Sequence, residues 1–497
     1  MRITNKMMTN NMMGNINKNK INMTKLEEQY STGKKIQKPS DDPIITVRAL
    51  KLRTNLSELN QYYEKNIPDA ESWMDVTESS LTTVNDIISK INSYCVQGST
   101  DTLTAENRSS ISENLKQLKE NIYQEGNTNY AGRYVFTGYK TDSSLTFMDD
   151  MDNLTYQITE SIDTKNIRIM NKVSGSYELA DFEDSGQNFD DSPVMNEIYR
   201  IQLAYEDLDA AAAPDGIVLY KKNAAGELEP ESTFPVTLSS VNASDAYTPP
   251  DGEVHYIPET GELILGKDAY EAMRQVDSLQ VTYTKTGFKS GDLKPEHYFD
   301  CTMTDSSKPE QGEITYTKAS QSIEYEVNYN QKLKVNTEAS DAITHSIGRK
   351  IDDIVSAVDE VIRTEAKIAE VEKRLEDTSL SEDDREKYNK MLEQLNTELV
   401  LKKEVMQQEF SSGIGDSAKW QDNVNTAVAD IGSRHVRLNL TENRLSDQKV
   451  DFEDLLSRNE DADIAETIVK YNAANTIYNA SLSAAAKVVK NTLLDFL

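Results

Sequence analysis

The sequence predicts an α+β fold: a long antiparallel helical coiled-coil domain, built from both ends of the chain, carries an inserted β-rich domain. Two observations support this prediction. Nine of the twelve prolines lie between Pro193 and Pro309 and none follows, so turns gather in the centre and the last third permits long helices. Apolar residues recur at steps of three and four in both end regions but alternate with polar residues in the centre.

The N-terminal region shows one long apolar stripe with a single interruption. Apolar residues alternate steps of four and three over residues 45–63, slip by one position, and resume over residues 74–95. We interpret the slip as a stutter in a coiled-coil seam, and Pro68 beside it is expected to kink or open the helix. A further helix is expected to start after Thr104, which is a suitable N-cap.

The C-terminal region repeats apolar residues at intervals of seven, which predicts long helices packed on one another. A polar turn, residues 377–382, separates the first two runs, so an antiparallel helical hairpin is expected at about residues 364–410, with Ile368 and Met406 on its facing arms. His435 falls within the last run and is predicted to be a packed core histidine. The repeating residues are Ile347, Ile354, Val361, Ile368 and Leu375, then Leu392, Leu399 and Met406, then Val424, Ile431, Leu438, Leu445 and Phe452.

The centre, residues 141–335, is predicted to form half-buried antiparallel strands. Apolar and polar residues alternate over 279–283 and over 323–329, and Gly, Pro, Asp and Asn turns separate such segments. One inserted helix is expected between Val194 and Leu208, where apolar residues recur at steps of four, three and seven.

Composition disfavours several classes of function. A formal net charge of -31 argues against binding to nucleic acid or to an anionic membrane surface. Cys95 and Cys301 are too few for a disulfide framework and lack the spacing of a metal site. No apolar run reaches the roughly 18 residues of a membrane helix, and no secretory signal peptide is recognisable. Taken alone, the missing signal peptide favours a cytosolic protein.

Catalytic motifs are absent from the sequence. It contains no H-E-x-x-H, no G-x-S-x-G, no Walker loop and no G-x-G-x-x-G. None of the four histidines pairs with a cysteine at ligand spacing. We therefore expect no enzymatic activity, no metal site and no cofactor.

A loop at residues 31–43 carries the signals of a helix end followed by a helix start. Gly33 is expected to close the first helix, with Lys34 and Lys35 placed to meet its carbonyl end. Ser40 or Asp41 is expected to cap the next helix, with Pro43 in its first turn. On physical grounds alone this is a helix–loop–helix connection.

A second loop, residues 130–139, is predicted to form a strand that leaves the helical region, bounded by Gly132 and Gly138. Both loops resemble signatures of the flagellin family. The segments 132–138, 323–327, 335–337 and 493–497 are similar to the branch of that family that joins hook to filament. The signature residues are Ser31, Thr32, Gly33, Lys34, Asp41, Asp42 and Pro43 in the first loop, and Gly132, Arg133, Tyr134, Phe136 and Gly138 in the second.

The resemblance implies a structural subunit of the bacterial flagellum that polymerises through helical coiled coils. The implied partners are further copies in a ring, the neighbouring hook-side junction protein, the flagellin filament or its cap, and a flagellar export chaperone. Nucleic acid, membrane and small-molecule substrates are not expected as partners. The resemblance also implies export through the flagellar type III apparatus without a cleaved signal peptide, and hence an extracellular location that replaces the cytosolic one.

The expected organisation has five parts, and the two outermost form the assembly surface. These parts are an N-terminal axial helix (1–30), an N-terminal arm (31–140), a variable domain (141–335), a C-terminal arm (336–463) and a C-terminal axial helix (464–497). Because their apolar stripes are thin, the axial helices are expected to be disordered in the monomer and to order on assembly. The expected seam comprises Ile3, Met7, Met12, Ile16, Met23, Leu26, Ile464, Ile468, Tyr471, Asn475, Tyr478, Leu482, Ala485, Val489, Leu493, Leu494, Phe496 and Leu497, and Asn475 is expected to fix its register.

Three alternative functions stay open at this point. A flagellin filament subunit would share the fold and differ in its copy number along the filament. An enzyme is suggested by flagellin relatives whose variable segments resemble zinc peptidases, although the missing H-E-x-x-H motif argues against it. An acidic coiled-coil adaptor of the cytoplasm would not be exported.

Overall fold

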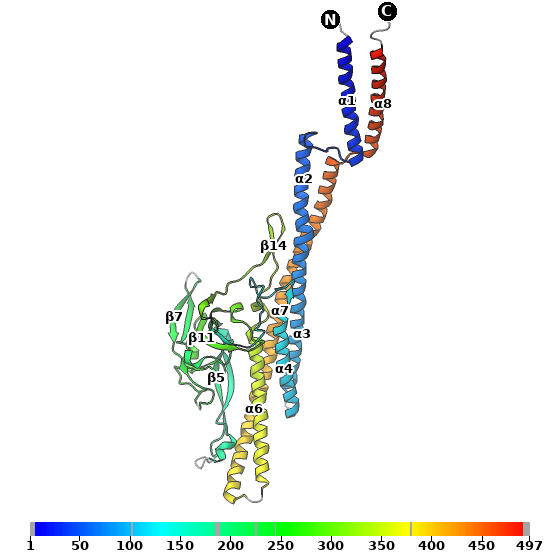
Figure 1. Ribbon diagram of the computed structural model, residues 1–497. Coiled ribbons are helices and arrows are strands. Elements are labelled where there is room, and N and C mark those ends of the chain that lie inside the picture. Colours follow the sequence, from blue (N-terminus) through cyan, green and yellow to red (C-terminus); the bar gives the residue numbers. More distant parts are fainter. Residues whose placement is uncertain are drawn as a thin grey trace, which may run out of the picture. The chain divides into compact units, whose positions relative to one another are not determined.

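The computed structural model describes residues 5–100, 103–183, 189–223, 226–243, 245–377 and 380–490, and it divides into two compact units. Unit 1 comprises the chain up to Ala70, residues Tyr325–Leu333 and the chain from Val436. Unit 2 comprises Glu71–Glu324 and Lys334–His435. Helical ends and a β-rich centre confirm the predicted α+β class (Figure 1).

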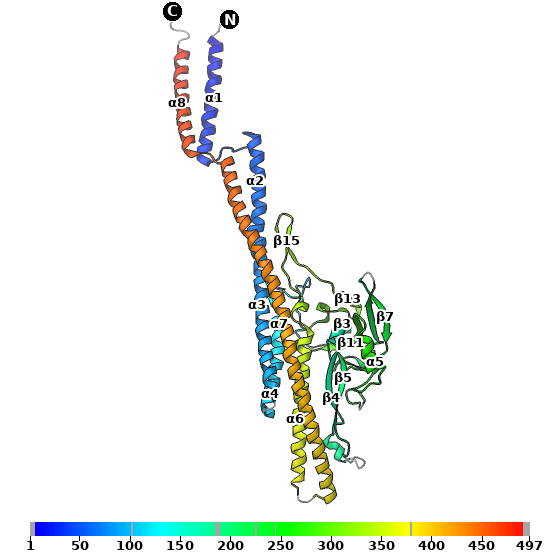
Figure 2. The same cartoon turned by 180° about the vertical axis from the view of Figure 1, so that it is seen from behind.

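Unit 1 consists of two helix pairs and a β-hairpin. Helix α1 (Asn5–Thr32) lies beside α8 (Ile464–Lys490), and α2 (Pro43–Gln61) lies beside the last part of α7 (Glu382–Glu460) (Figure 2). The hairpin of β14 (Glu324–Asn328) and β15 (Gln331–Lys334) is attached to the second helix pair. The attachment includes hydrogen bonds from Asn66 to the Glu326 carbonyl (2.8 Å) and from Gln331 to the Thr441 hydroxyl (3.1 Å).

A π-helix interrupts the apolar stripe of the N-terminal arm. It spans Tyr62–Asn66, between α2 and α3 (Ile67–Gly98), and the Ile67 N–H bonds to the Tyr62 carbonyl five residues earlier. A π-turn holds one residue more than an α-turn, so the buried face shifts by one position. This shift confirms the predicted slip, and Pro68, which has no N–H to donate, lies in the first turn of α3.

The helical part of unit 2 contains α3 from Glu71 onward, α4 (Ala105–Glu125), α6 (His345–Leu375) and α7 as far as His435. Thr104 caps α4 as predicted, since its hydroxyl accepts the Asn107 N–H. Most heptad positions lie in the core, as predicted, but Leu375, Leu392 and Leu399 are only partly buried, and the second run instead buries Met391 and Leu395. Ile347, Ile354, Val361, Val424 and Ile431 are all at most 1% exposed.

Helices α6 and α7 form an antiparallel hairpin around the predicted polar turn. Ser381 begins the second arm, where its Oγ accepts the Asp384 N–H at 3.0 Å. Ile368 packs in a buried cluster with Leu395, and Met406 lies outside that cluster, so Ile368 and Met406 do not face each other as expected. The spacing by sevens fixes the buried face of each arm but not the register between the arms, and the register depends on the length of the turn.

The β-rich part of unit 2 contains two sheets. The six-stranded sheet has the order β13-β12-β3-β11-β6-β7, formed by Ile314–Tyr316, Asp300–Asp305, Met151–Asp163, Ser278–Phe288, Ile217–Lys222 and Leu228–Phe234. The five-stranded sheet has the order β4-β5-β10-β9-β8, formed by Arg168–Ser174, Val194–Gln202, Glu262–Leu265, Val254–Ile257 and Thr237–Leu238. Neighbouring strands are antiparallel except β8 and β9, which are parallel.

One apolar core is shared by the two sheets. It includes Leu279, Val281 and Tyr283 of β11, which alternate with more exposed residues as predicted, and Tyr256 and Leu263 from the other sheet. The short helix α5 (Lys267–Met273) adds Ala269 and Met273 to the same core. The sheets therefore form a sandwich with its own hydrophobic centre.

Two predictions for the centre need correction. The expected helix from Val194 to Leu208 is wrong, because this segment contains β5, which pairs with β4 and β10 at once. As an inner strand it buries Ile198 on one face and Ile201 on the other, and burial on both faces imitates a helical spacing. The alternation over 323–329 ends early, since Tyr329 is 75% exposed, and residues 325–333 belong to unit 1 rather than to the sandwich.

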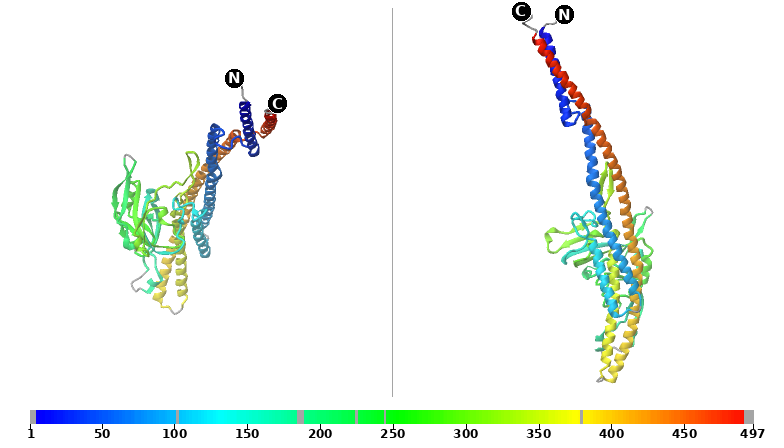
Figure 3. Two further views of the ribbon diagram at one scale, coloured as in Figure 1. Left: turned by 45° about the horizontal axis from the view of Figure 1, so that its top comes forward. Right: turned by 90° about the vertical axis from the view of Figure 1, so that its right-hand side faces the viewer.

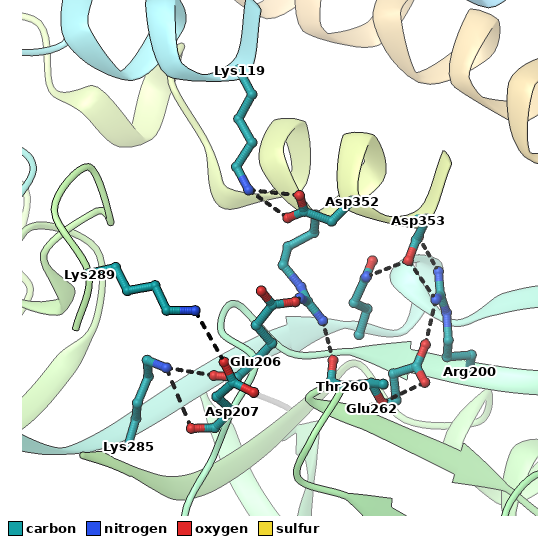
Figure 4. A network of polar contacts seen from close by, with 12 residues as sticks. Lys119, Arg200, Glu206, Asp207, Thr260, Glu262, Lys285, Lys289, Asp352 and Asp353 are labelled. Atoms are coloured by element: carbon teal, nitrogen blue, oxygen red, sulfur yellow. Dashed lines mark hydrogen bonds and ion pairs between the residues drawn. The ribbon is translucent and has the colours of Figure 1, made fainter. Parts of the chain in front are cut away.

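Buried ion pairs attach the sandwich to α6. Arg200 of β5 donates to both carboxylate oxygens of Asp353 (3.0 and 2.6 Å) and to Glu262 (2.6 Å), as Figure 4 shows. The Arg200 side chain is 3% exposed, so it needs these partners to compensate for lost hydration. On the neighbouring α6 residue, Asp352 accepts a more exposed contact from Lys119 of α4.

Candidate assembly surface

The two terminal helices pack along one seam. The least exposed residues of α1 include Met12, Ile16, Met23 and Leu26, as predicted, whereas Met7 is 52% exposed. A polar contact crosses the seam where Asn19 of α1 donates to the Ser481 hydroxyl of α8 at 3.0 Å. Asn475, the residue expected to fix the register, accepts instead from Asn479 of its own helix. A polar pair that meets across a seam penalises sliding, so the contact between Asn19 and Ser481 favours this register.

The seam on α8 is rotated from the expected one. The least exposed α8 residues are small, polar or aromatic, namely Thr467, Tyr471, Ala474, Asn475, Tyr478, Ser481 and Ala485. Tyr471, Asn475, Tyr478 and Ala485 agree with the expectation, but Ile464, Ile468 and Leu482 stay at least 37% exposed. The bulky Met and Ile side chains of α1 leave little space opposite them, which favours the stripe of small residues.

Large apolar side chains cover the outward faces of both helices. Met13 and Ile21 of α1 are 56% and 69% exposed, and Val469 and Ile477 of α8 are 67% and 55% exposed. Soluble monomers rarely expose so many apolar side chains on one short segment. The helix pair therefore has one seam used within the chain and a second apolar surface available to other chains.

Some residues of the expected seam lie outside the described residues. These are Ile3, Leu493, Leu494, Phe496 and Leu497, together with the side chain of Val489.

The first signature loop joins the end of α1 to the end of α7. Gly33 ends α1 as predicted: its φ is +70°, its N–H bonds to the Gln29 carbonyl, and its own carbonyl accepts the Ala462 N–H at 2.8 Å. Lys35 adds a backbone hydrogen bond to the Glu460 carbonyl (2.6 Å), and its Nζ donates to the Arg458 carbonyl (2.7 Å). Lys34 and Lys35 were expected to meet the carbonyl end of α1. Lys35 instead contacts the carbonyl end of α7, which is distant in sequence.

Four charged side chains reinforce this joint. Glu460, 8% exposed, accepts from Arg53 of α2 at 2.6 Å and lies 3.4 Å from the Lys34 Nζ. Lys34 also donates to Asp461 at 2.5 Å, and this hydrogen bond raises the pKa of Lys34 and lowers the pKa of Asp461. The hydrogen bond to Glu460 likewise raises the pKa of Arg53. Lys34 therefore stays positive beside two carboxylates, and α1, α2, α7 and α8 all meet here.

The helix that follows the loop begins one residue later than expected. Asp42, not Ser40 or Asp41, caps α2, because its Oδ1 accepts the N–H groups of Ile44 and Ile45 at 3.1 Å. Asp41 instead accepts the N–H groups of Lys38 and Gln37, and these hydrogen bonds lower its pKa. Pro43 occupies the first turn as predicted.

Ser31 and Thr32 complete the first signature loop at the end of α1. Both hydroxyls donate to the Glu28 carbonyl, at 3.2 and 2.6 Å. Both hydroxyls therefore bond to the same carbonyl group near the end of α1.

The second signature loop forms a tight hairpin inside unit 2. Strands β1 (Asn129–Tyr130) and β2 (Arg133–Tyr134) pair around Ala131 and Gly132, both with positive φ. Phe136 is buried, and the Tyr139 N–H beyond Gly138 donates to the Gln321 side chain. The Arg133 guanidinium lies 4.9 Å from the centre of the Trp73 ring. This loop connects the helices to the sandwich and is a structural element.

The histidines and cysteines occupy structural positions. Burial lowers the pKa of His297 and of His345 to about 3, and it raises the pKa of the Cys95 and Cys301 thiols to about 11 and about 12. Across the described ranges, no group of three or more His, Cys, Asp or Glu side chains could hold a metal ion. Nor does any helix in those ranges have the length and apolarity to cross a bilayer.

The prediction for His435 is wrong. Its side chain is 15% exposed, and its Nε2 lies 3.4 Å from Asp75 and 3.8 Å from Glu78 of α3. The core of α7 here uses Ile431 and Leu438, so a histidine four residues after the first of them lies at the edge of the helix contact.

Both ends of the chain match models of known protein regions. Residues 3–141 match the bacterial flagellin N-terminal helical region, and residues 417–497 match the bacterial flagellin C-terminal helical region. The first match contains α1, α2 and both signature loops, and the second contains most of α7 and all of α8.

Curated relatives resemble parts of the chain. The flagellar hook-associated protein 3 of Salmonella typhimurium is 32% identical over 145 residues, which cover 29% of this chain and 45% of that protein. A flagellin of Clostridium tyrobutyricum is 32% identical over 128 residues, covering 26% and 34% respectively. The chain thus spans less than half the length of these relatives.

A solved structure adds a distant likeness. A crystal structure of FlgL from Xanthomonas campestris has a TM-score of 0.31 and 12% identity, and the match covers 82% of this chain and 99% of that one. A TM-score at this level supports no further conclusion. The two helical ends of this chain are thus similar to flagellin regions, and neither family model matches the β-rich centre between them.

Proposed function

We propose that this protein is a structural subunit of the bacterial flagellum that joins hook to filament, in the manner of hook-associated protein 3 (FlgL). The observation that carries the proposal is the α1–α8 pair, which has one seam within the chain and a second apolar surface facing outward. The 32% identity to the Salmonella hook-associated protein and the two flagellin regions support it.

Polymerisation in this proposal is driven by the outward face of the terminal helices. Complete burial of an exposed Leu or Ile side chain is worth roughly 1.5–3 kcal/mol. Leu482 and Ile477, at 41% and 55% exposed, retain about half of that gain for contacts with neighbouring chains. Several such side chains on each copy supply the association energy, and the joint at Lys34 and Glu460 directs the helix pair.

The proposed partners follow from the same proposed role as a junction subunit. Further copies of the chain form a ring, which contacts the hook-side junction protein on one side and the flagellin filament or its cap on the other. An export chaperone covers the terminal helices before secretion through the flagellar type III apparatus, and no signal peptide is cleaved. We expect no catalysis and no cofactor.

A flagellin filament subunit is the second candidate. The match to the Clostridium tyrobutyricum flagellin, also at 32% identity, supports it. It predicts the same helix pairing, because flagellin regions at both chain ends are common to the two proteins.

Immunogold labelling of isolated flagella separates the candidates. A single labelled band between hook and filament supports the junction subunit, and labelling along the whole filament supports the flagellin. Labelling in the cell body alone would refute both flagellar candidates and favour the cytoplasmic coiled-coil adaptor. The zinc content of the purified protein provides the check on the enzyme alternative.

A further inference from the structure

Helix α2 carries an apolar face that is separate from the terminal helices. Ile44, Val47 and Leu50 follow one another at steps of three and are 75%, 67% and 55% exposed. Arg48 and Lys51 flank this face, and no carboxylate occurs between Asp42 and Glu58. Arg53, the next basic residue of α2, forms an ion pair with Glu460. Among the described residues, Arg48 and Lys51 have no acidic partner. This basic apolar face is called face B.

The last part of α7 carries a face of opposite charge. Val436, Leu440 and Val450 are 61%, 68% and 63% exposed. Their spacing of 4 and then 10 residues keeps them on one side of the helix, and Asp447 and Asp451 fall on that side as well. Neither aspartate has a basic partner among the described residues. This acidic apolar face is called face A.

Faces A and B lie at different levels of unit 1. Face B belongs to the first turns of α2, which contact the end of α7 through the hydrogen bond from Asn459 to the Ile45 carbonyl (3.1 Å). Face A lies earlier on α7, where Lys449 contacts Glu64 of the π-helix (2.6 Å) and where Leu438 and Leu445 are the buried residues. Figure 3 shows this pairing of α2 and α7 from two further directions. A contact between A and B within one chain is therefore excluded by geometry.

We infer that face B of one chain binds face A of a second copy of the same chain. The charge signs are complementary, since Arg48 and Lys51 would meet Asp447 and Asp451, and both faces present bulky aliphatic side chains at their centre. A contact of face A with a second face A, or of face B with a second face B, would bring like charges together, which disfavours a symmetric dimer.

A contact between two different faces is head-to-tail. Such contacts produce a closed ring when the rotation between copies closes and an open helical array when it does not. The inference deepens the proposed function, because it specifies which lateral surfaces connect neighbouring subunits, in addition to the terminal helices. It holds for both the junction subunit and the filament subunit.

Paired cysteine substitutions test the contact in isolated flagella. A small panel places one cysteine at Val47 or Leu50 and the other at Leu440 or Val450 in the same chain. The native Cys95 and Cys301 are buried, so they contribute little background. Because the two sites of one chain lie at different levels, a head-to-tail contact gives a ladder of disulfide-linked multimers after oxidation, while each single substitution leaves monomers. Val47→Cys with Val400→Cys is the matched control, as Val400 is 65% exposed on unit 2.

Charge reversal tests the complementarity. Arg48→Glu with Lys51→Glu, or Asp447→Lys with Asp451→Lys, should each reduce incorporation into flagella by roughly 10-fold, because like charges then meet. The chain that combines all four changes should recover to within a few-fold of wild type. Glu229→Lys with Glu231→Lys, on the exposed strand β7, alters the net charge equally and should have no effect. Circular dichroism checks that every variant stays helical.

The outcomes separate this inference from the proposed function. A multimer ladder and rescue by the fourfold change support the contact. Two outcomes would refute the contact between faces A and B while the proposed function stands, provided that wild-type protein is found in the flagellum. The first is that no cysteine pair of the panel gives a ladder, and the second is that the chain with all four charge changes does not recover incorporation. Dimers from a single substitution would also refute the contact, since they indicate a symmetric interface. Wild type that never reaches the flagellum refutes the proposed function itself.

Discussion

Replacing Asp353 by alanine should loosen the attachment of the β sandwich to α6. The Asp353 carboxylate accepts three hydrogen bonds: two from Arg200, at 3.0 and 2.6 Å, and one from Gln202 at 2.9 Å. Its side chain is 12% exposed and that of Arg200 is 3% exposed. Without Asp353, the buried guanidinium would keep Glu262 alone as an ionic partner.

The size of the effect can be worked out in two ways. Removing one partner of a buried ion pair typically destabilises a protein by 3–5 kcal/mol, and the remaining contact to Glu262 favours the lower end, about 3 kcal/mol. The second route uses the pKa. Burial alone would raise the pKa of Asp353, but the charge of Arg200 outweighs it and lowers that pKa from 3.8 to about 2. A shift of this size corresponds to about 2–3 kcal/mol, in agreement with the first value.

The pKa also sets the direction of the pH dependence. A carboxylate whose pKa is lower in the folded state stabilises the fold above its unfolded pKa, and the contribution is lost as protons bind. Asp353 should therefore contribute fully above about pH 4 and progressively less as the pH falls toward 2. The difference in unfolding free energy between wild type and the alanine variant should shrink over the same interval.

Urea unfolding followed by tryptophan fluorescence measures this effect. Both tryptophans, Trp73 and Trp420, are buried in unit 2, and Trp420 of α7 donates to Ser346 of α6. Asp352→Ala is the matched control, because this neighbouring aspartate pairs with Lys119 where both side chains are 27% exposed. Such half-exposed pairs contribute about 0.2–1 kcal/mol. Equal losses for the two variants, or a difference that does not change between pH 4 and pH 2, would refute the reasoning from burial.

Four further predictions concern the helices and the sandwich. The α1–α8 seam is built from few side chains, which on α8 are mostly small or polar, so the pair should open readily in dilute monomer. Hydrogen exchange there should show no protection in residues 5–25 and 465–490 and strong protection within 45–122; protected ends would contradict ordering on assembly. Leu482→Asp should leave the melting of the monomer unchanged and abolish assembly, whereas Ser483→Asp, on the adjacent exposed residue, should assemble normally. Replacing residues 142–316 by a short Gly/Ser linker should preserve export and the hook–filament connection, because the β14–β15 hairpin of unit 1 is retained; exported protein without filaments would argue against it. Cysteines at Ile368 and Leu395 should form a disulfide across the α6–α7 hairpin, and cysteines at Ile368 and Met406 should not.

The helical architecture could be predicted because its signal is local and repeated. Every turn of a packed helix must bury the same face, so positions such as Val361 and Ile431 recur at a fixed interval and are fully buried. The same regularity detected the slip, which the sequence placed just after Ala70, and the structure inserts the extra residue a few positions earlier, in the π-turn Tyr62–Asn66. Turn chemistry identified Gly33 as the end of α1, since its positive φ strongly favours glycine. It did not identify the hairpin turn at Ala131 and Gly132, where only a strand was predicted.

Features that depend on distant partners could not be predicted in this way. The strand β5 lies between β4 and β10, and its burial on both faces leaves no alternation for a sequence pattern to detect. Lys34 and Lys35 follow α1 closely in sequence, yet their partners are Asp461 and the carbonyl end of α7. Ser40, Asp41 and Asp42 are all suitable caps, and the choice depends on the extended backbone of Asp42 before Pro43.

The partly misplaced seam on α8 has a different cause, which bears on the proposed assembly. Its sequence contains two stripes at steps of three and four, and periodicity cannot tell which of them faces α1. In the structure the small residues around Ala474 pack against α1, while Ile468, Ile477 and Leu482 remain exposed. A helix of a polymerising subunit needs both stripes, since one sets the geometry of the helix pair and the other supplies apolar area to neighbours. Because different residues serve the two purposes, substitutions on one stripe can change assembly without changing the fold of the monomer.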